Sequence, residues 1–292
     1  MKKINIFCFG FGQVAKNFIY NLSKRYDVNL ATTSRDETKK KKIYGINYIS
    51  YHFLDNSFDK EILKKIKNYD YILVSIPPKN GIDIVVENFQ QTLENIKVSW
   101  ITYLSATSVY GDHNGKWVDE NSKVNPLTEN GKSRLSAEKS WLNLVKKKNL
   151  PIQIFRLSGI YSKEKNILER IKSGSHQIIN SPKHFFSRIH VEDISNILQL
   201  TLEKKNISPG EIYNLSDDYP CSNIEVANYA YDLMKTLKPK MVEIREIQSE
   251  MLKNFYKDSK KVSNSKVKKI FSYKLKFPTY KEGLRNIFNH II

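Results

Sequence analysis

The stretch "FCFGFGQVAKNF", residues 7–18, places two glycines between an apolar run and a segment with helical spacing. At such a junction Gly10 would allow a tight turn, and Gly12 would let the backbone approach a pyrophosphate. The following helix would direct its free N–H groups and the positive end of its dipole toward the phosphates. We therefore expect Gly10, Gly12, Gln13 and Val14 to form a dinucleotide phosphate loop, with an ordinary glycine turn as the alternative.

Strand and helix signals alternate through the first half of the chain. Strands are expected at residues 3–9, 28–34, 70–78, 98–106 and 151–161, and helices at 14–26, 59–69, 85–97 and 133–148. Such alternation predicts βαβ units, hence an α/β fold with a doubly wound parallel (Rossmann) sheet and a smaller C-terminal α/β substrate lobe. We place the dinucleotide-binding domain at residues 1–160, joined by about 186–205, and the substrate lobe at 161–292.

The end of the second expected strand bears on the choice of cofactor. An acidic residue there would bind the adenine-ribose hydroxyls, but this chain reads "TTSRDE" at residues 32–37. The hydroxyl of Ser34 and the guanidinium of Arg35 suit a phosphate monoester, because arginine forms bidentate charge-assisted hydrogen bonds. NADP is therefore the expected cofactor, and Asp36 keeps NAD open as the alternative.

The sequence "SIPP", residues 75–78, ends a later strand. Ligands of doubly wound sheets bind at the carboxyl ends of the strands near the switch point. Ser75, Ile76 and Pro77 are therefore expected to form a wall beside the cofactor. A rigid strand exit without a ligand is an equally simple interpretation.

The chain is basic, with 48 Lys and Arg against 30 Asp and Glu and a net charge of +18. Its lysines are scattered, with runs only at 39–42 and 146–148, which favours a solvated surface over a nucleic-acid partner. Two distant cysteines fit a reducing cytoplasm. No apolar run is long enough to span a membrane, and Gly10, Gly12 and Gln13 interrupt the one that could imitate a signal peptide. No two histidines have metal-ligand spacing, so no metal is expected.

A further signal lies in residues 103–141, "YLSATSVYGDHNGKWVDENSKVNPLTENGKSRLSAEKSW". Together with "GFGQVA", "FRLSGIY", "FSRIHVEDI" and "EIYNLSDDYP", it resembles the extended short-chain dehydrogenase/reductase superfamily, more narrowly its atypical NAD(P)-dependent sugar epimerase/dehydratase-like branch. The resemblance implies hydride transfer between a sugar-like carbinol and nicotinamide, with a Tyr and a Lys in a YxxxK motif as the acid/base machinery. Family members often form dimers through a four-helix contact, to which residues 133–147 could contribute.

This sequence departs from the family pattern at three positions that carry the chemistry. Asn130 stands in the place of the Tyr, Arg134 in the place of the Lys, and Ala106 in the place of a Ser or Thr. Asn cannot titrate and Arg stays protonated, so neither is the usual base. The replacement candidates are Ser105, which is also a candidate cofactor contact, Thr107, Tyr110 and Arg134.

Two hypotheses about function follow. In the first, the protein is an NADP(H)-dependent oxidoreductase or epimerase/dehydratase-like enzyme acting on a sugar or sugar-nucleotide-like substrate. Tyr161 would then lie at the substrate and Arg188 would hold an anionic group on it. In the second, the protein binds the cofactor without dehydrogenase activity, as a redox sensor or regulatory partner, because the usual catalytic residues are missing.

Overall fold

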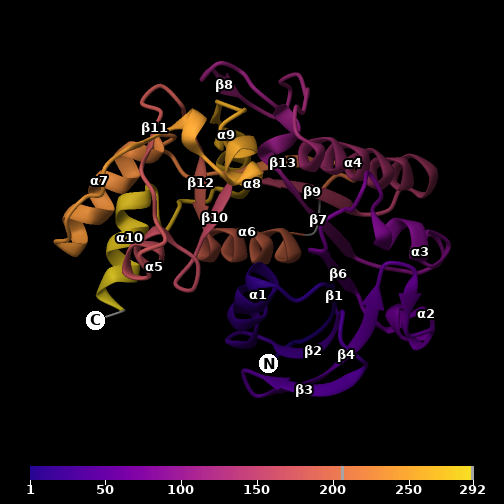
Figure 1. Cartoon of the computed structure of the whole chain (residues 1–292). Helices are drawn as coiled ribbons and strands as arrows, with labels where there is room; N and C mark the ends of the chain where they lie inside the picture. The colour runs from indigo at the N-terminus through magenta and orange to yellow at the C-terminus, as the bar shows by residue number, and fades with distance from the viewer. Residues whose placement is uncertain (205–206, 291–292) are drawn as a thin grey trace. The chain divides into compact units, whose positions relative to one another are not determined.

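The computed structural model describes residues 1–204 and 207–290 (Figure 1). The chain divides into two compact units, and it passes between them several times. Unit 1 comprises Met1–Ala106, Lys132–Arg156 and Ile194–Tyr213. Unit 2 comprises Thr107–Gly131, Leu157–Asp193 and Asn214–Ile292.

Unit 1 is built on a mostly parallel sheet with the strand order β13–β9–β7–β6–β1–β2–β4–β3. The strands are β1 (Lys3–Phe9), β2 (Asp27–Ser34), β3 (Lys39–Ile43), β4 (Ile46–Leu54), β6 (Tyr71–Val74), β7 (Trp100–Ala106), β9 (Ile152–Leu157) and β13 (Ile212–Leu215), and the short β5 (Ser57–Phe58) pairs with β4. Strand β1 lies between β2 and β6 and is parallel to both. The strand order therefore reverses at β1, which is a topological switch point.

Helices cover both faces of this sheet (Figure 1). On one face α1 (Gln13–Ser23) lies beside α6 (Val191–Glu203), and Asn21 Nδ2 donates to Asn196 Oδ1 at 3.0 Å. On the other face α3 (Ile84–Glu94) lies beside α4 (Glu129–Lys148), and Trp141 Nε1 donates to Asp83 Oδ2 at 3.0 Å. The short α2 (Glu61–Lys65) contributes Ile62 to the apolar core on this second face. The predicted fold class, a doubly wound parallel sheet, is confirmed.

A hairpin at the sheet edge was not among the expected elements. Strand β3, "KKKKI", runs antiparallel to β4, and a two-residue turn at Tyr44 and Gly45 connects them. Both turn residues have positive φ angles, 50° and 81°, as a tight hairpin turn requires. Lysine is depleted in strands generally, but it is common on edge strands, where charge discourages pairing with other chains.

Unit 2 contains short parallel strand pairs and several helices. The pairs are β10 (Gly159–Tyr161) with β12 (Arg188–His190), β11 (Ile179–Asn180) with β14 (Val242–Glu243), and β15 (Lys261–Val262) with β8 (Trp117–Val118). The helices are α5 (Ile167–Lys172), α7 (Asn223–Met234), α8 (Glu250–Phe255), α9 (Ser265–Phe271) and α10 (Tyr280–Asn289), with 3-10 turns at Thr107–Tyr110 and Ile244–Glu246. Their apolar faces form a core of their own, which includes Leu168, Ala230 and Leu284.

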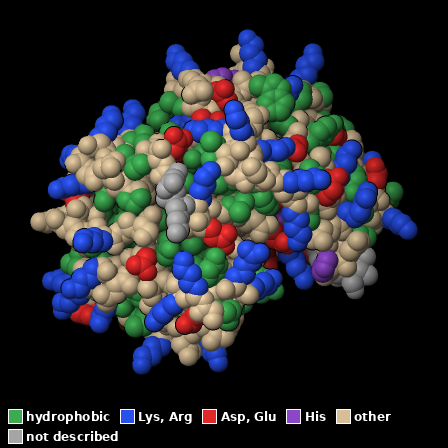
Figure 2. Space-filling model, turned by 180° about the vertical axis from the view of Figure 1, so that it is seen from behind, with side chains coloured by type: hydrophobic (Ala, Val, Ile, Leu, Met, Phe, Trp, Pro, Cys, Tyr) green, Lys and Arg blue, Asp and Glu red, His purple; other side chains and the backbone are tan. Residues whose placement is uncertain are grey.

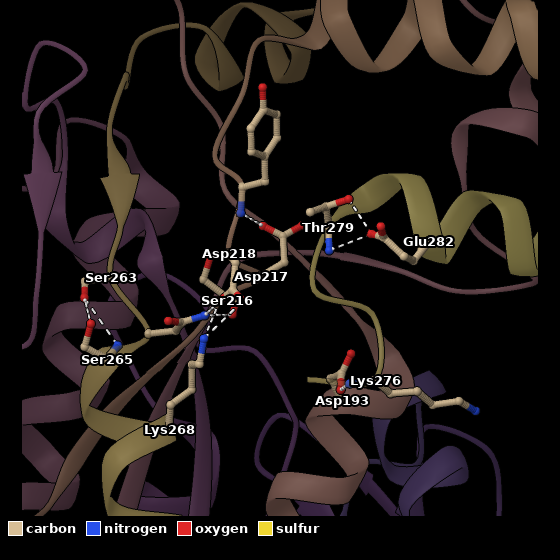
Figure 3. Close-up of polar contacts among 12 residues, drawn as sticks. Asp193, Ser216, Asp217, Asp218, Ser263, Ser265, Lys268, Lys276, Thr279 and Glu282 are labelled. Carbon is tan, nitrogen blue, oxygen red and sulfur yellow. Dashed lines mark hydrogen bonds and ion pairs between the residues drawn. The ribbon is translucent and has the colours of Figure 1, made fainter. Parts of the chain in front are cut away.

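Side-chain caps define where the unit 2 helices begin. Ser222 caps α7 by accepting from Glu225 N, as the Ser-x-x-Glu spacing predicts, while the Glu225 carboxylate accepts from Tyr280 Oη at 3.1 Å. Thr279 and Glu282 form a reciprocal capping box at α10 (Figure 3). These caps satisfy backbone N–H groups that the first helical turn leaves without partners.

Candidate functional site

The glycine loop after β1 is held in place by two neighbouring strands. Gly10 has a φ of +81° and donates its N–H to Thr33 Oγ1 at 2.9 Å. The Ser75 hydroxyl lies under the loop, 3.2 Å from Phe9 O and 3.1 Å from Gly10 O. A Cβ at position 10 would meet Ser75 Oγ at 2.9 Å, so both the backbone angle and the available space favour glycine.

Gly12 occupies the N-cap position of α1 and has open space in front of it. No heavy atom lies within 4 Å of the place where a Cβ would be, and φ is an ordinary −83°. The helix has no side-chain N-cap bond and no acidic residue in its first turn. Val14 and Ala15 are buried, so their side chains leave the open space at Gly12 free. This cradle fits a pyrophosphate, which needs backbone N–H groups and no side chain in the way.

The end of β2 carries one unpaired cation. Arg35 is exposed, and its guanidinium makes no ion pair with any acid of the described ranges 1–204 and 207–290. Asp36 lies 3.7 Å from both Lys39 Nζ and Lys41 Nζ. Ser34 Oγ accepts from Ser50 Oγ at 3.1 Å. The arrangement therefore leaves Arg35 available to an anion, while lysines already neutralise the carboxylate beside it.

A buried ionic network lies where β7 meets α4. Ser105 Oγ donates to Glu138 Oε1 at 2.6 Å, and Arg156 donates to the same carboxylate from Nε at 3.0 Å and from Nη2 at 2.7 Å. All three side chains are nearly inaccessible. The Ser105 hydroxyl therefore already donates to a buried carboxylate. The local sequence "SATSVYG" could not predict this, because Glu138 lies 33 positions further along the chain.

Arg134 is held at the carboxyl end of the same strand. Its Nη1 donates to Leu104 O at 2.7 Å and lies 3.4 Å from Tyr103 Oη. Burial raises the pKa of Tyr103 far above its ordinary value, so this phenol stays neutral. The remaining N–H groups of the Arg134 guanidinium can donate to a ligand without breaking the backbone contact.

The structure places Thr107 and Tyr110 on one 3-10 turn of unit 2. The Tyr110 hydroxyl donates to Asn214 Oδ1 at 2.7 Å, and the side chain is fully buried. The Thr107 side chain is half-buried, and its hydroxyl has no partner among the described residues. Of these two predicted residues, Thr107 is the one whose hydroxyl remains available to a ligand.

Unit 2 contains a cavity of about 770 Å³, and both predicted substrate residues, Tyr161 and Arg188, line it. The cavity also has apolar and aromatic walls, contributed by Ile178, Phe186, Leu252 and Phe255. A cavity of this size, with mostly apolar walls and a few polar groups, is typical of small-molecule sites.

Two guanidinium groups line this cavity, and they differ in their hydrogen bonding to the protein. Arg188 donates to Phe186 O at 3.2 Å and to Asn223 Oδ1, so its orientation is set by the protein. Arg170 lines the same cavity from the last turn of α5 and has no acidic or hydrogen-bond partner for its guanidinium within the described chain. Partial burial, together with the charge of Arg188, lowers the pKa of Arg170. Sequence reasoning missed Arg170, because a basic residue in a last helical turn is ordinary helix chemistry.

The lining also carries Glu164, Lys165 and Glu169, whereas the nearby histidines and Tyr161 are uncharged near neutral pH. Burial lowers the pKa of His176 and of His190 to about 4. Burial raises the pKa of Tyr161 well above its usual value, and its hydroxyl lies so close to Gly283 that a Cβ there would collide with it. Tyr161 therefore lines the cavity as a packed aromatic ring. The basic side chains of the lining, Lys165, Arg170 and Arg188, outnumber its two glutamates.

Asp217 lies among other polar side chains of unit 2 (Figure 3). Burial raises its pKa to about 8, although the charge of Arg188 opposes the shift, and Oδ1 accepts from Tyr219 N at 3.2 Å. The next residue, Asp218, instead binds Lys268 Nζ at 2.9 Å and Asn264 Nδ2 at 2.7 Å. Adjacent aspartates thus have opposite environments, one desolvated and one paired with a cation.

Basic side chains are spread over the face of the molecule drawn in Figure 2. Figure 2 shows Lys and Arg across the whole visible face, with acidic side chains among them. No helix among residues 1–204 and 207–290 has both the length and the hydropathy needed to cross a membrane. Within the same described ranges, no group of three or more His, Cys, Asp and Glu side chains could hold a metal ion.

A parallel sheet with a switch point, and a glycine loop at the N-terminus of the first helix, define the class of Rossmann-like α/β proteins. Residues 83–216 match the model of the NAD dependent epimerase/dehydratase family. The match confirms the predicted resemblance to this family over that stretch of the chain.

Solved structures similar to the chain cover almost its whole length. A functionally unknown conserved protein from Silicibacter pomeroyi DSS is 28% identical, with a TM-score of 0.84 over 98% of this chain and 99% of that one. UDP-glucuronic acid 4-epimerase from Bacillus cereus, in complex with NAD, is 16% identical, with a TM-score of 0.79 over 99% and 96%. The dTDP-glucose 4,6-dehydratase of Bacillus anthracis, in complex with NAD, is 18% identical, with a TM-score of 0.75 over 98% and 96%. No curated protein matches the sequence significantly.

Proposed function

We propose that the protein binds NADP(H) and acts on a sugar-nucleotide-like substrate. The observation that carries the proposal is the loop from Gly10 to Gly12, which the Thr33 and Ser75 side chains hold at the open N-terminus of α1. The match of residues 83–216 to the NAD dependent epimerase/dehydratase family supports the dinucleotide. The unpaired guanidinium of Arg35 supports the phosphorylated form, because a 2′-phosphate offers it a bidentate partner.

The cavity of unit 2 supports an anionic substrate. Arg170, Arg188 and Lys165 outnumber the two glutamates of the lining, Glu164 and Glu169. The aromatic side chains of Phe186 and Phe255 supply flat apolar surface. A nucleotide diphosphate joined to a sugar combines a base that stacks, a diphosphate that binds arginine, and hydroxyls that accept hydrogen bonds. Two structural neighbours, both under 20% identical, are a UDP-glucuronic acid 4-epimerase and a dTDP-glucose 4,6-dehydratase, which agrees with this substrate class.

In the proposed reaction, the bound nicotinamide would supply hydride acceptor or donor chemistry. The chain would hold the cofactor with the Gly10–Gly12 loop and with Arg134, whose guanidinium is already fixed at Leu104 O. Thr107 would fix a substrate hydroxyl, since its own hydroxyl has no partner in the described residues. Asn130 would orient a water or a substrate group by hydrogen bonding, because an amide cannot accept the proton itself.

A second candidate, a cofactor-binding protein without dehydrogenase activity, is favoured by one specific observation. Neither phenol that could replace the missing Tyr is suited to proton transfer, because Tyr110 is fully buried against Asn214 and burial raises the pKa of Tyr161. A general acid or base needs a pKa near the working pH and access to the substrate. This candidate shares the cofactor site with the first and differs only in turnover.

Two measurements separate these functions. Calorimetric titration of the protein with NADPH and NADH tests the cofactor site, and absence of binding for both at about millimolar concentration contradicts both candidates. Turnover is then measured by coupled hydride transfer and by product analysis on a panel of UDP- and dTDP-sugars. Cofactor binding with turnover supports the enzyme, whereas cofactor binding without turnover on any sugar nucleotide supports the second candidate.

A further inference from the structure

The edge strand β3 presents its lysines alternately to the two faces of the sheet. Lys39 pairs in register with Ser50 and Lys41 with Tyr48, whereas Lys40 pairs with Ile49. Directly opposed residues of antiparallel strands lie on the same face, and neighbours along a strand lie on opposite faces. Lys39 and Lys41 therefore share one face, and Lys40 and Lys42 share the other.

The face that carries Lys39 and Lys41 also carries part of the proposed cofactor site. The Ser50 hydroxyl, opposite Lys39, donates to Ser34 Oγ at 3.1 Å. The Tyr48 ring, opposite Lys41, contacts the ring of Phe11, with centroids 5.5 Å apart, and Phe11 lies between the two glycines of the loop. Two independent contacts thus join this face of the hairpin to the end of β2 and to the phosphate loop.

Asp36 orients both ammonium groups toward the end of β2. Its carboxylate lies 3.7 Å from Lys39 Nζ and 3.7 Å from Lys41 Nζ, and it follows Arg35 directly in the chain. Two lysines therefore border this one carboxylate, and with Arg35 as the preceding residue the segment keeps an excess of positive charge. Because its charge is already matched, Asp36 is poorly suited to accept hydrogen bonds from ribose hydroxyls.

We propose that Lys39 and Lys41 are specificity-determining residues that bind the 2′-phosphate of NADP(H) together with Arg35, and that Asp36 positions them. The proposal rests on the proposed function for the cofactor and adds the hairpin to it. The ligand group is a phosphate monoester on the adenine ribose. Its negative charge would balance the positive charge of Arg35, Lys39 and Lys41 that the single carboxylate of Asp36 does not neutralise. Lys40 and Lys42 take no part, because they lie on the other face of the strand.

The test compares two double variants with identical charge changes, Lys39→Gln with Lys41→Gln and Lys40→Gln with Lys42→Gln. Titration calorimetry measures the dissociation constants of NADPH and NADH for each variant and for the unaltered chain. We expect the first double variant to weaken NADPH about tenfold and NADH less than about twofold, as for the loss of two partly exposed charge contacts. The second double variant should change both constants less than about twofold. Raising the salt concentration should reduce the difference between the variants, because exposed charges are screened.

The outcomes distinguish this inference from the proposed function. If the unaltered chain binds NADPH but the two double variants weaken it equally, the lysines act only through overall charge and the inference is overturned. The inference is also overturned if the first double variant weakens NADH as much as NADPH. If the unaltered chain binds neither cofactor, the proposed function fails and takes the inference with it.

Discussion

Ser75 and Gly10 directly follow two different strands, and the Ser75 hydroxyl lies 3.1 Å from the Gly10 carbonyl oxygen, under the loop. The same hydroxyl would lie 2.9 Å from a Cβ at position 10. The pair links the end of β6 to the end of β1, its neighbour in the sheet. The two glycines of the loop therefore differ in the space around them: Gly10 is enclosed by Ser75, whereas Gly12 faces open space.

A substitution at Gly10 should therefore destabilise the fold, while one at Gly12 should not. Gly10→Ala is expected to lower the free energy of unfolding by about 1–3 kcal/mol, because it combines a positive φ with a close contact. Gly12→Ala, the matched control, should change it by less than about 0.5 kcal/mol, since the site is open and φ is ordinary. Urea unfolding measures both, and equal losses would contradict the difference between the two positions.

Negative charge at Gly12 should abolish dinucleotide binding without unfolding the protein. Gly12→Asp places a carboxylate where the pyrophosphate is proposed to lie, and an N-cap aspartate is compatible with the helix. We expect the dissociation constant for NADPH to rise at least about 100-fold with an unchanged or higher Tm. Calorimetry and thermal unfolding check the two parts, and retained affinity would show that the phosphates bind elsewhere.

Arg170 should contribute to binding of an anionic substrate in the unit 2 cavity. Arg170→Gln is expected to weaken UDP-sugar binding about tenfold, because it removes a positive charge from the cavity. The substitution should leave the fold intact, since the guanidinium has no partner within the described chain. Lys172→Gln is the matched control, since Lys172 is a cation on the same helix outside the cavity lining. Titration with UDP-sugars measures the effect, and equal weakening by the two substitutions would point to general charge.

The stability of the protein should depend on pH through Asp217. Its folded pKa is about 8, against about 3.8 for an unperturbed aspartate, so the folded chain keeps a proton that the unfolded chain releases between these values. Stability contributed by this group therefore falls as pH rises from about 4 to about 8. Asp217→Asn removes that loss and keeps an acceptor for Tyr219 N, so its Tm should exceed that of the unaltered chain by an increasing margin across this range.

The control for this pH dependence is Asp232→Asn, which alters an exposed aspartate on α7. Thermal unfolding at several pH values from about 4 to 8 gives the comparison. The Asp232 variant should follow the unaltered chain throughout. A constant difference in Tm between the Asp217 variant and the unaltered chain would contradict the titration of Asp217.

Breaking the buried Glu138–Arg156 pair should be costly. Glu138→Gln keeps an acceptor for Ser105 but leaves the Arg156 charge buried without a carboxylate, and we expect a loss of about 3–5 kcal/mol in the free energy of unfolding. Glu87→Gln, on the exposed side of α3, should cost less than about 0.5 kcal/mol. Chemical unfolding measures both values, and a small loss for Glu138→Gln would show that water or another acid compensates the arginine.

Sequence patterns alone predict the sheet, the glycine turn after the first strand and the resemblance to the epimerase/dehydratase family. These depend on local signals: apolar runs of strand length, helical periodicity, and glycines at the turn where the first strand ends. The β3–β4 hairpin was not predicted, because four consecutive lysines are unusual in a strand. The lysines form a strand here because they pair with β4 at the edge of the sheet.

Which polar side chains are available to a ligand depends on contacts that form in the folded chain. Ser105, Thr107 and Tyr110 look alike as hydroxyls in one short motif, yet Ser105 donates to a buried carboxylate, Tyr110 to a buried amide, and Thr107 to no described residue. The partners of such groups lie about 30 to 100 positions away in sequence, at Glu138 and Asn214. Hydrogen bonding and desolvation depend on these distant neighbours, so no local pattern contains them.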